Sequence, residues 1–304
     1  MSFDDYLLHM FCLLDEELKD LTRRVGPLRH HGRPPTLADS EVLTMVLAGE
    51  FLGIDTDKGI YAFFRRHHRR EFPALARAHR TTFVRQAANL WRAAQLLHAR
   101  LLGRLPLRDE AVDGEPLWLV DSFPLHVCRF ARAKGSRLFK GHGAAFGHDH
   151  LERNPLFGFR VHGRCSGRGP VAQVELAPAD VSDPAAAAAL VPPEGGVGIG
   201  DRNYWAPDRQ ADLARISFPL LAPYKNKSKD PAPDRSRLLT RLRRTIETVI
   251  GQLAERFNAK RTRARDLWHL CARLTRKVLS HTAALLLNLR QGNPPLRLEL
   301  LIDT

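Results

Sequence analysis

The sequence predicts an α/β protein in which an all-α N-terminal domain precedes a mixed β-sheet with flanking helices. Apolar residues recur at helical spacing through residues 1–105, whereas short apolar runs typical of strands begin near residue 117. Two of those runs end in an aspartate, at Asp121 and Asp201. We therefore expect two domains, a helical domain at 1–105 and an α/β domain at 106–304.

The helical domain is predicted from the spacing of its apolar residues. The first helix carries them three or four positions apart, at Leu7, Phe11, Leu14, Leu18 and Leu21. A later helix is marked by Phe83, Leu90, Leu97 and Leu101 and ends near Gly103. Together these patterns indicate a helical bundle.

The α/β domain begins with a buried strand. Residues 117–120 are Leu-Trp-Leu-Val, a continuous apolar run that is typical of a strand covered on both faces. Residues 157–162 alternate between apolar and other side chains, as strands do. After the turn at 166–170, residues 171–176 form a returning strand, so this pair predicts a hairpin.

Helices and two further strands follow in alternation. The segment 182–184, Ser-Asp-Pro, is typical of a helix start. We expect a strand at 197–200, a helix at 207–215 and a last strand at 218–222. From Ser236 onward the pattern is helical nearly to the end of the chain.

Two of the predicted strands lead directly into an acid. Asp121 follows the apolar run at 117–120, and Asp201 follows Val-Gly-Ile-Gly at 197–200. A carboxylate just past the C-terminal end of a buried strand lies at the usual ligand crevice of an open α/β sheet. These two acids are therefore candidate site residues.

Glu247 is the third candidate acid, because it lies at the edge of an apolar helix face. A helix over 238–257 would form one apolar stripe from Leu239, Leu242, Ile246, Val249, Ile250, Leu253 and Phe257. Glu247, Arg243 and Thr240 fall on the flank of that stripe. From there the carboxylate of Glu247 can reach the sheet crevice.

The order of these elements is that of an RNase H-like core: a strand with Asp, a hairpin, a helix, a strand with Asp, a helix, a strand and a helix with Glu. Three carboxylates suit Mg²⁺, or alternatively Mn²⁺, because both are hard cations that prefer oxygen ligands. Two such ions can stabilise the attacking and leaving oxygens of a phosphoryl transfer.

Four segments in this order resemble the DDE transposases of bacterial insertion sequences. They are Val-Asp-Ser-Phe-Pro-Leu at 120–125, Phe-Gly-Phe-Arg-Val-His at 157–162, Gly-Asp-Arg-Asn-Tyr at 200–204 and Arg-Arg-Thr-Ile-Glu-Thr at 243–248. The last resembles the family's Arg-x-x-x-Glu segment. The chain departs from the family pattern at Thr240 and Ala254, where the family often has Tyr and a basic residue.

The resemblance implies a DNA transposase that cleaves DNA strands and transfers them in a metal-dependent reaction. Asp121, Asp201 and Glu247 would then be both the catalytic acids and the ligands of Mg²⁺ or Mn²⁺. The helical domain at 1–105 would bind DNA ends or mediate dimerisation, and the partners would be double-stranded DNA and a second copy of the chain in a homodimer.

The charge of the chain also points to a polyanionic partner. The chain has 304 residues with a formal net charge of +14, and the segment 225–277 contributes 16 basic and 5 acidic residues, a net +11. We expect this segment to follow a DNA backbone. The candidate DNA-binding residues are Arg243, Arg244, Arg256, Lys260, Arg261, Arg263 and Arg265.

Composition excludes several other classes of protein. No apolar run is long enough for a transmembrane helix, and the first residues do not resemble a secretory signal. The four cysteines form no Cys-x-x-Cys pair, so a cysteine-rich zinc module is not expected. We expect a cytoplasmic protein that associates with the nucleoid.

Two alternatives share this pattern of acids and charge. One is an RNase H-like DNA nuclease, such as a junction resolvase, which cleaves without joining strands. The other is a catalytically decayed transposase that binds DNA as a repressor. Joined DNA products distinguish the first alternative, and metal-dependent cleavage distinguishes the second.

Overall fold

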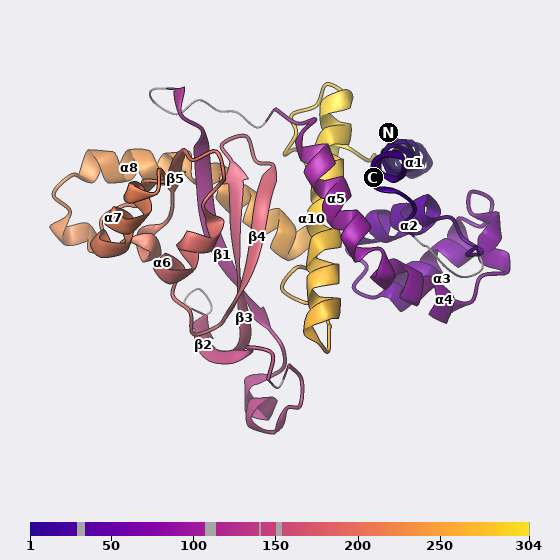
Figure 1. Cartoon of the computed structure of the whole chain (residues 1–304), viewed down its shortest axis with the longest axis horizontal. Coiled ribbons are helices and arrows are strands. Elements are labelled where there is room, and N and C mark those ends of the chain that lie inside the picture. Colours follow the sequence, from indigo (N-terminus) through magenta and orange to yellow (C-terminus); the bar gives the residue numbers. More distant parts are fainter. Residues whose placement is uncertain (29–33, 107–113, 140, 150–153, 304) are drawn as a thin grey trace. The chain divides into compact units, whose positions relative to one another are not determined.

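The structure is a computed structural model that describes residues 1–28, 34–106, 114–139, 141–149 and 154–303. The chain forms two compact units (Figure 1). One, the helical unit, consists of Met1–Leu105 and Glu255–Thr304, and the other, the sheet unit, is Pro106–Ala254. The predicted α/β domain at 106–304 differs from this division, because residues 255–304 belong to the helical unit.

The helical unit is built from six α-helices in the described residues. They are α1 (Phe3–Val25), α2 (Asp39–Phe51), α3 (Asp57–His67), α4 (Arg80–Asn89), α5 (Trp91–Leu102) and α10 (Leu267–Arg290). Helix α1 begins at the cap residue Ser2, whose hydroxyl oxygen accepts a hydrogen bond from the backbone N–H of Asp5.

Helix α10 explains why the end of the chain joins this unit. From Val278 to Asn288 every residue of the helix is buried, and the helix packs along α5 and α2 (Figure 1). Such a helix has no polar face to turn toward solvent, so it must be surrounded by other helices. The N-terminal helices surround α10. The spacing of apolar residues within α10 did not indicate which helices it packs against.

Buried ion pairs attach α10 to α2 and α3. Glu50 is 1% exposed and its carboxylate contacts Arg276 at 2.6 Å and the ammonium of Lys277. Arg276 also contacts Asp57 at 2.5 Å. Two cations of the segment 225–277 are therefore used inside the helical unit and do not face solvent.

The sheet unit contains one mixed sheet, in the order β2-β3-β1-β5-β6, with β4 paired to β3. Strands β1, β3 and β4 are antiparallel neighbours, whereas β1, β5 and β6 are parallel. This arrangement confirms the predicted RNase H-like mixed sheet. The strands are β1 (Leu117–His126), β2 (Ala145–Asp149), β3 (Asn154–Ser166), β4 (Val171–Pro178), β5 (Val197–Ile199) and β6 (Leu220–Leu221).

Helices cover both faces of the sheet because the side chains of β1 alternate. Trp118 and Val120 pack against a cluster that includes Leu190 and Leu213. Leu119 faces the other way, in a cluster with Leu239 and Ile246. The first face is covered by the short 3₁₀ helix η4 (Ala187–Leu190), which follows α6 (Asp183–Ala186), and by α7 (Pro207–Arg215). The second face is covered by α8 (Pro233–Leu242) and α9 (Arg244–Gly251).

Several predicted elements have different bounds in the structure, and two of these differences affect the elements that carry candidate acids. The strand expected at 117–120 continues to His126, because its second half pairs with β3. The helix expected over 238–257 is broken at Arg243 into α8 and α9, and it continues as a π-helical turn, η7 (Gln252–Arg256).

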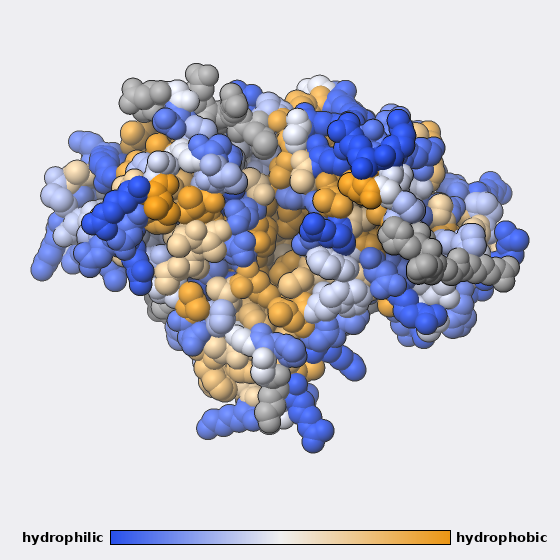
Figure 2. All heavy atoms as spheres, in the orientation of Figure 1, coloured by the Kyte–Doolittle hydropathy of each residue, from blue (hydrophilic) through white to orange (hydrophobic). Residues whose placement is uncertain are grey.

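The surface over α7 and α8 is mostly hydrophilic (Figure 2). Exposed basic residues of α8 at Arg235, Arg237 and Arg241 contribute to it. Among the described residues, no helix is long and apolar enough to cross a membrane.

Candidate active site

The strand register places Asp121 and Asp201 beside each other. Strands β1 and β5 run parallel, with Leu119 paired to Ile199. Asp121 and Asp201 each lie two residues beyond that pair, on the carboxyl side. The predicted crevice is therefore at the point where the two parallel strands end their pairing.

Asp121 is a largely buried carboxylate with two hydrogen bonds. Its Oδ1 accepts from the backbone N–H of Ser122 at 2.8 Å, and its Oδ2 accepts from Nη2 of Arg243 at 2.9 Å. Burial raises the pKa of Asp121 from 3.8 to about 6, although Arg243 opposes the rise; the charges of Asp201 and Asp183 add to it. The site thus holds more negative charge than Arg243 offsets.

Asp201 begins the short 3₁₀ helix η5 (Arg202–Tyr204). Its Oδ1 accepts from the backbone N–H of Asn203 at 2.8 Å, and its Oδ2 accepts from the Asn203 side-chain amide at 3.0 Å. Burial raises the pKa of Asp201 too, again against the effect of Arg243. Gly200 fits here because a Cβ at this position would lie 2.7 Å from the ring of Tyr204.

Glu247 is brought toward the strand acids by α9, which packs on β1. Its side chain is 52% exposed, and its Oε1 lies 3.4 Å from Nη1 of Arg243. The side chain of Arg243 is only 9% exposed and bridges Glu247 to Asp121. The break between α8 and α9 falls at this residue, so the bridging cation lies at the junction of the two helices.

Divalent cations fit this donor set. The carboxylates of Asp121 and Glu247 contact one buried guanidinium. The pKa values of Asp121 and Asp201 are raised mainly by burial and further by neighbouring carboxylates. A hard cation that prefers oxygen ligands would compensate this negative charge. Arg243 provides the positive charge between Asp121 and Glu247.

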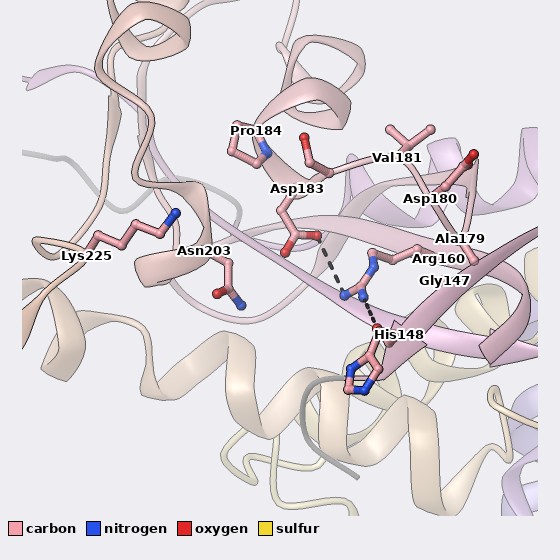
Figure 3. Close-up of a pocket in the computed structure, with 11 residues that line it drawn as sticks. Gly147, His148, Arg160, Ala179, Asp180, Val181, Asp183, Pro184, Asn203 and Lys225 are labelled. Carbon is pink, nitrogen blue, oxygen red and sulfur yellow. Dashed lines mark hydrogen bonds and ion pairs between the residues drawn. The ribbon is translucent and has the colours of Figure 1, made fainter. Parts of the chain in front are cut away.

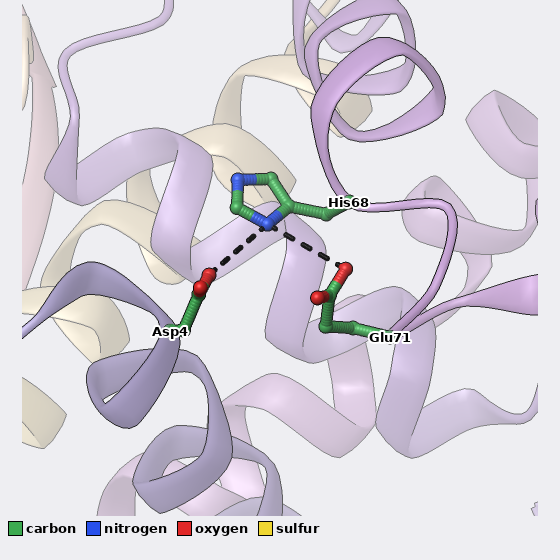
Figure 4. A group of neighbouring side chains, drawn as sticks. All are labelled: Asp4, His68 and Glu71. Carbon is green, nitrogen blue, oxygen red and sulfur yellow. Dashed lines mark ion pairs between the residues drawn. The ribbon is translucent and has the colours of Figure 1, made fainter.

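A tighter group of possible metal ligands lies in the helical unit (Figure 4). In the described part of the chain, donor atoms of Asp4, His68 and Glu71 lie within 4.8 Å of one another. Nδ1 of His68 is 3.5 Å from Asp4 and 3.8 Å from Glu71. Both acids are exposed, and we interpret the group as ion pairs at the surface. Asp121, Asp201 and Glu247 are not gathered this closely.

A polar cluster on the other face of β1 was not found from the sequence. It centres on Asp183, whose Oδ1 accepts from the hydroxyl of Ser122 at 2.8 Å. Arg160 and His162 of β3 lie 3.8 and 3.6 Å from the same oxygen. Burial lowers the pKa of His162 to about 4, so its ring is neutral at pH 7. The sequence showed Asp183 only as part of a helix start, a pattern that carries no information about its partners.

The candidate DNA-binding residues are divided between the two units. Arg243 is buried in the acidic site, whereas Arg244 beside it is exposed. Arg256 is half-buried, with its guanidinium 4.5 Å from the ring centre of Phe51. Lys260 is also half-buried, and the exposed members of the helical unit are Arg261, Arg263 and Arg265, of which Arg263 pairs with Asp55 at 3.0 Å.

One comparison with known proteins found a match. A family model described as a transposase DDE domain matches residues 113–267, a range that contains all three acids. No curated protein and no solved structure matches the chain.

Proposed function

Since the chain belongs to the transposase DDE domain family, we propose that it cuts DNA strands at the ends of an insertion sequence and joins them to target DNA. The observation that carries the proposal is the position of the acids. Asp121 and Asp201 lie two residues beyond one strand pair, and Arg243 bridges Asp121 to Glu247.

Asp121, Asp201 and Glu247 would hold two divalent cations, Mg²⁺ or Mn²⁺. When bound, these ions supply activation of a water or a 3′-hydroxyl and stabilisation of the leaving oxygen. The carboxylates must be ionised to act as ligands. Arg243 favours that state, because its charge opposes the rise in pKa of both aspartates.

DNA phosphates would contact the exposed arginines. Arg244 is exposed and begins α9, directly after Arg243 and three residues before Glu247. A phosphate bound by Arg244 would therefore lie near the part of α9 that carries the third acid. Arg261, Arg263 and Arg265 add cations in the helical unit. We propose that the helical unit binds DNA ends, that the chain acts as a homodimer, and that it acts in the cytoplasm at the nucleoid.

The test uses the purified full-length chain with DNA that carries the inverted repeats flanking its gene, a target plasmid and Mg²⁺. We expect cleaved ends and joined products. The variants Asp121→Asn, Asp201→Asn and Glu247→Gln should each abolish both while DNA binding is kept, because each removes a charge and preserves the shape. Asp212→Asn, an exposed acid of α7, is the matched control.

Each other outcome has a definite meaning. Cleavage without joining would identify a nuclease and contradict strand transfer. Binding of the ends without any metal-dependent cleavage would identify a decayed transposase. Normal turnover by one of the three acid variants would remove that residue from the site.

A further inference from the structure

The chain between β1 and β3 forms a basic lobe, which comprises the described residues 129–139 and 141–148. The lobe contains the short 3₁₀ helix η3 (Phe130–Gly135) and strand β2 (Figure 1). It has no acidic residue, and its four basic residues are all exposed: Arg129, Arg132, Lys134 and Arg137. Among the residues that the structure describes, none of these four side chains forms an ion pair, so their charge is available to a polyanion.

Two phenylalanines of the lobe are exposed, although side chains of this kind are usually buried. Phe130 is 44% exposed and Phe146 is 49% exposed. Their ring centres lie 5.7 Å apart with the ring planes at 81°, and the ring of Phe146 also lies 4.8 Å from that of Phe157 in β3. These contacts hold the two rings in place, and the exposed area of each ring is available for stacking.

A cavity of about 370 Å³ opens in the same lobe. Lys134 and Arg137 supply cations to its lining, Phe139 and Phe157 supply aromatic rings, and none of the described residues that line it is acidic. Phe139 has a backbone φ of 56°, in the left-handed region that a bulky side chain rarely adopts. Cations and aromatic rings without acids suit a nucleotide, which carries a phosphate and a flat base.

The larger cavity of the sheet unit, of about 530 Å³, has a different charge balance. Its cations are Arg160 and Lys225, but Asp180 and Asp183 also line it. Figure 3 shows Arg160 paired with Asp183 at 3.8 Å and donating to the backbone carbonyl of His148 at 3.0 Å. Because acids offset its cations, this cavity is a poorer match for DNA than the basic lobe.

The basic lobe follows β1 on the carboxyl side of Asp121. From Asp121 to His126, the last residue of β1, the strand advances five residues, a rise of about 17 Å. That length equals about five nucleotide steps along one strand of B-form DNA. DNA with a phosphate at the acids can therefore reach the lobe within a few nucleotides.

We propose that the basic lobe binds unpaired DNA, with bases stacked on Phe130 and Phe146 and a phosphate held by Lys134 and Arg137. The inference rests on the proposed function, because it names the form of DNA that the chain holds beside its acids. Every base has an aromatic face, whereas in a duplex those faces are covered by neighbouring bases. The lobe therefore prefers single strands and does not require a particular sequence.

Fluorescence anisotropy tests this with the full-length chain, a labelled oligothymidylate and a labelled duplex of the same length. Phe130→Leu and Phe146→Leu should each weaken oligothymidylate binding about fivefold or more, because leucine stays apolar but has no ring face. Duplex binding should change less than about twofold. Ile216→Ala, which removes an apolar side chain that is 55% exposed elsewhere in the sheet unit, should leave both affinities unchanged.

The salt dependence tests the phosphate contact separately. Lys134→Gln and Arg137→Gln should each flatten the log–log slope for oligothymidylate by about 0.7 for each phosphate no longer neutralised. Arg209→Gln, at an exposed arginine of α7, is the control and should leave the slope unchanged. An unchanged slope in both lobe variants would overturn the assignment of the phosphate to this cavity.

Three other results would overturn the proposal. They are unchanged oligothymidylate affinity in both phenylalanine variants, an equal loss for the duplex, and loss of a dimer in sedimentation without loss of DNA affinity, which would make the rings a contact between copies of the chain. If oligothymidylate binds the lobe but no DNA is cleaved or joined, the proposed function fails and the lobe assignment stands.

Ultraviolet crosslinking of oligothymidylate to the unsubstituted chain locates the DNA without any variant. Mass spectrometry should find crosslinks in peptides that contain Phe130 or Phe146. Crosslinks confined to other peptides would exclude the lobe as the binding site, even if a leucine variant does not fold.

Discussion

Replacing Asp121 with Asn should make the stability of the metal-free protein less dependent on pH. Asp121 is 19% exposed and lies close to two other acids, so its ionised form is unfavourable in the folded chain. Asparagine has nearly the same shape but never ionises. The variant also loses the ion pair with Arg243, and we treat the free energy of that loss as the same at every pH. The change in the difference between the two proteins across a pH series therefore reports the titration of Asp121 alone.

The size of the effect follows from the pKa of Asp121, which is raised from 3.8 to about 6. Because the folded-state pKa is the higher one, the folded chain binds more protons in this range, and the stability from this group is lost as pH rises through about 6. With about 1.4 kcal/mol for each pKa unit, the whole effect is about 3 kcal/mol. Between about pH 5 and pH 7.5 it amounts to about 1.4 kcal/mol.

Urea unfolding in the presence of a chelator measures this difference. From about pH 5 to pH 7.5, Asp121→Asn should gain about 1.4 kcal/mol in free energy of unfolding relative to the original chain. Asp212→Asn, whose side chain is 57% exposed, should show no such trend. A difference that stays constant with pH would refute our account of the site as a buried surplus of negative charge.

Three further perturbations test other parts of the structure. Glu50→Gln leaves the buried Arg276 and its neighbouring lysine without their shared carboxylate, so urea unfolding should show a loss of about 3–5 kcal/mol. Gly200→Ala places a Cβ 2.7 Å from Tyr204 and should cost about 1–3 kcal/mol and weaken Mn²⁺ binding, whereas Gly251→Ala, with nothing within 4 Å, should not. DNA affinity should fall steeply with salt, and the log–log slope should flatten by about 0.9 for each phosphate that the protein no longer neutralises. The charge-removing variants for that measurement are Arg261→Gln, Arg263→Gln and Arg265→Gln; an unchanged slope would place the phosphate-binding surface elsewhere.

The strands and the acids next to them could be predicted because their signals are local. The apolar run at 117–120 and the one at 197–200 each identify a buried strand, and the acid after each run marks its end. The hairpin of β3 and β4 was also predicted, since its two strands are joined by a short turn. Such patterns depend on neighbouring residues, so they can be read without knowing the fold.

The role of Arg243 could not be predicted in this way. The spacing around it favoured a continuous helix with Arg243 on the flank and available to DNA. In the structure the helix breaks there and the side chain is buried against Asp121, which is 122 positions away in the sequence. A contact of that separation leaves no periodic pattern.

The sequence by itself determined the mixed sheet, the strand ends that carry Asp121 and Asp201, and the helix that carries Glu247. Only the tertiary structure decided that α10 packs among the N-terminal helices, that Arg276 and Lys277 are buried with Glu50, and that Asp183 accepts a hydrogen bond from Ser122. The physical reason is that secondary structure follows from residue spacing along one segment. The partner of a buried charge is instead fixed by which distant segments the core brings together.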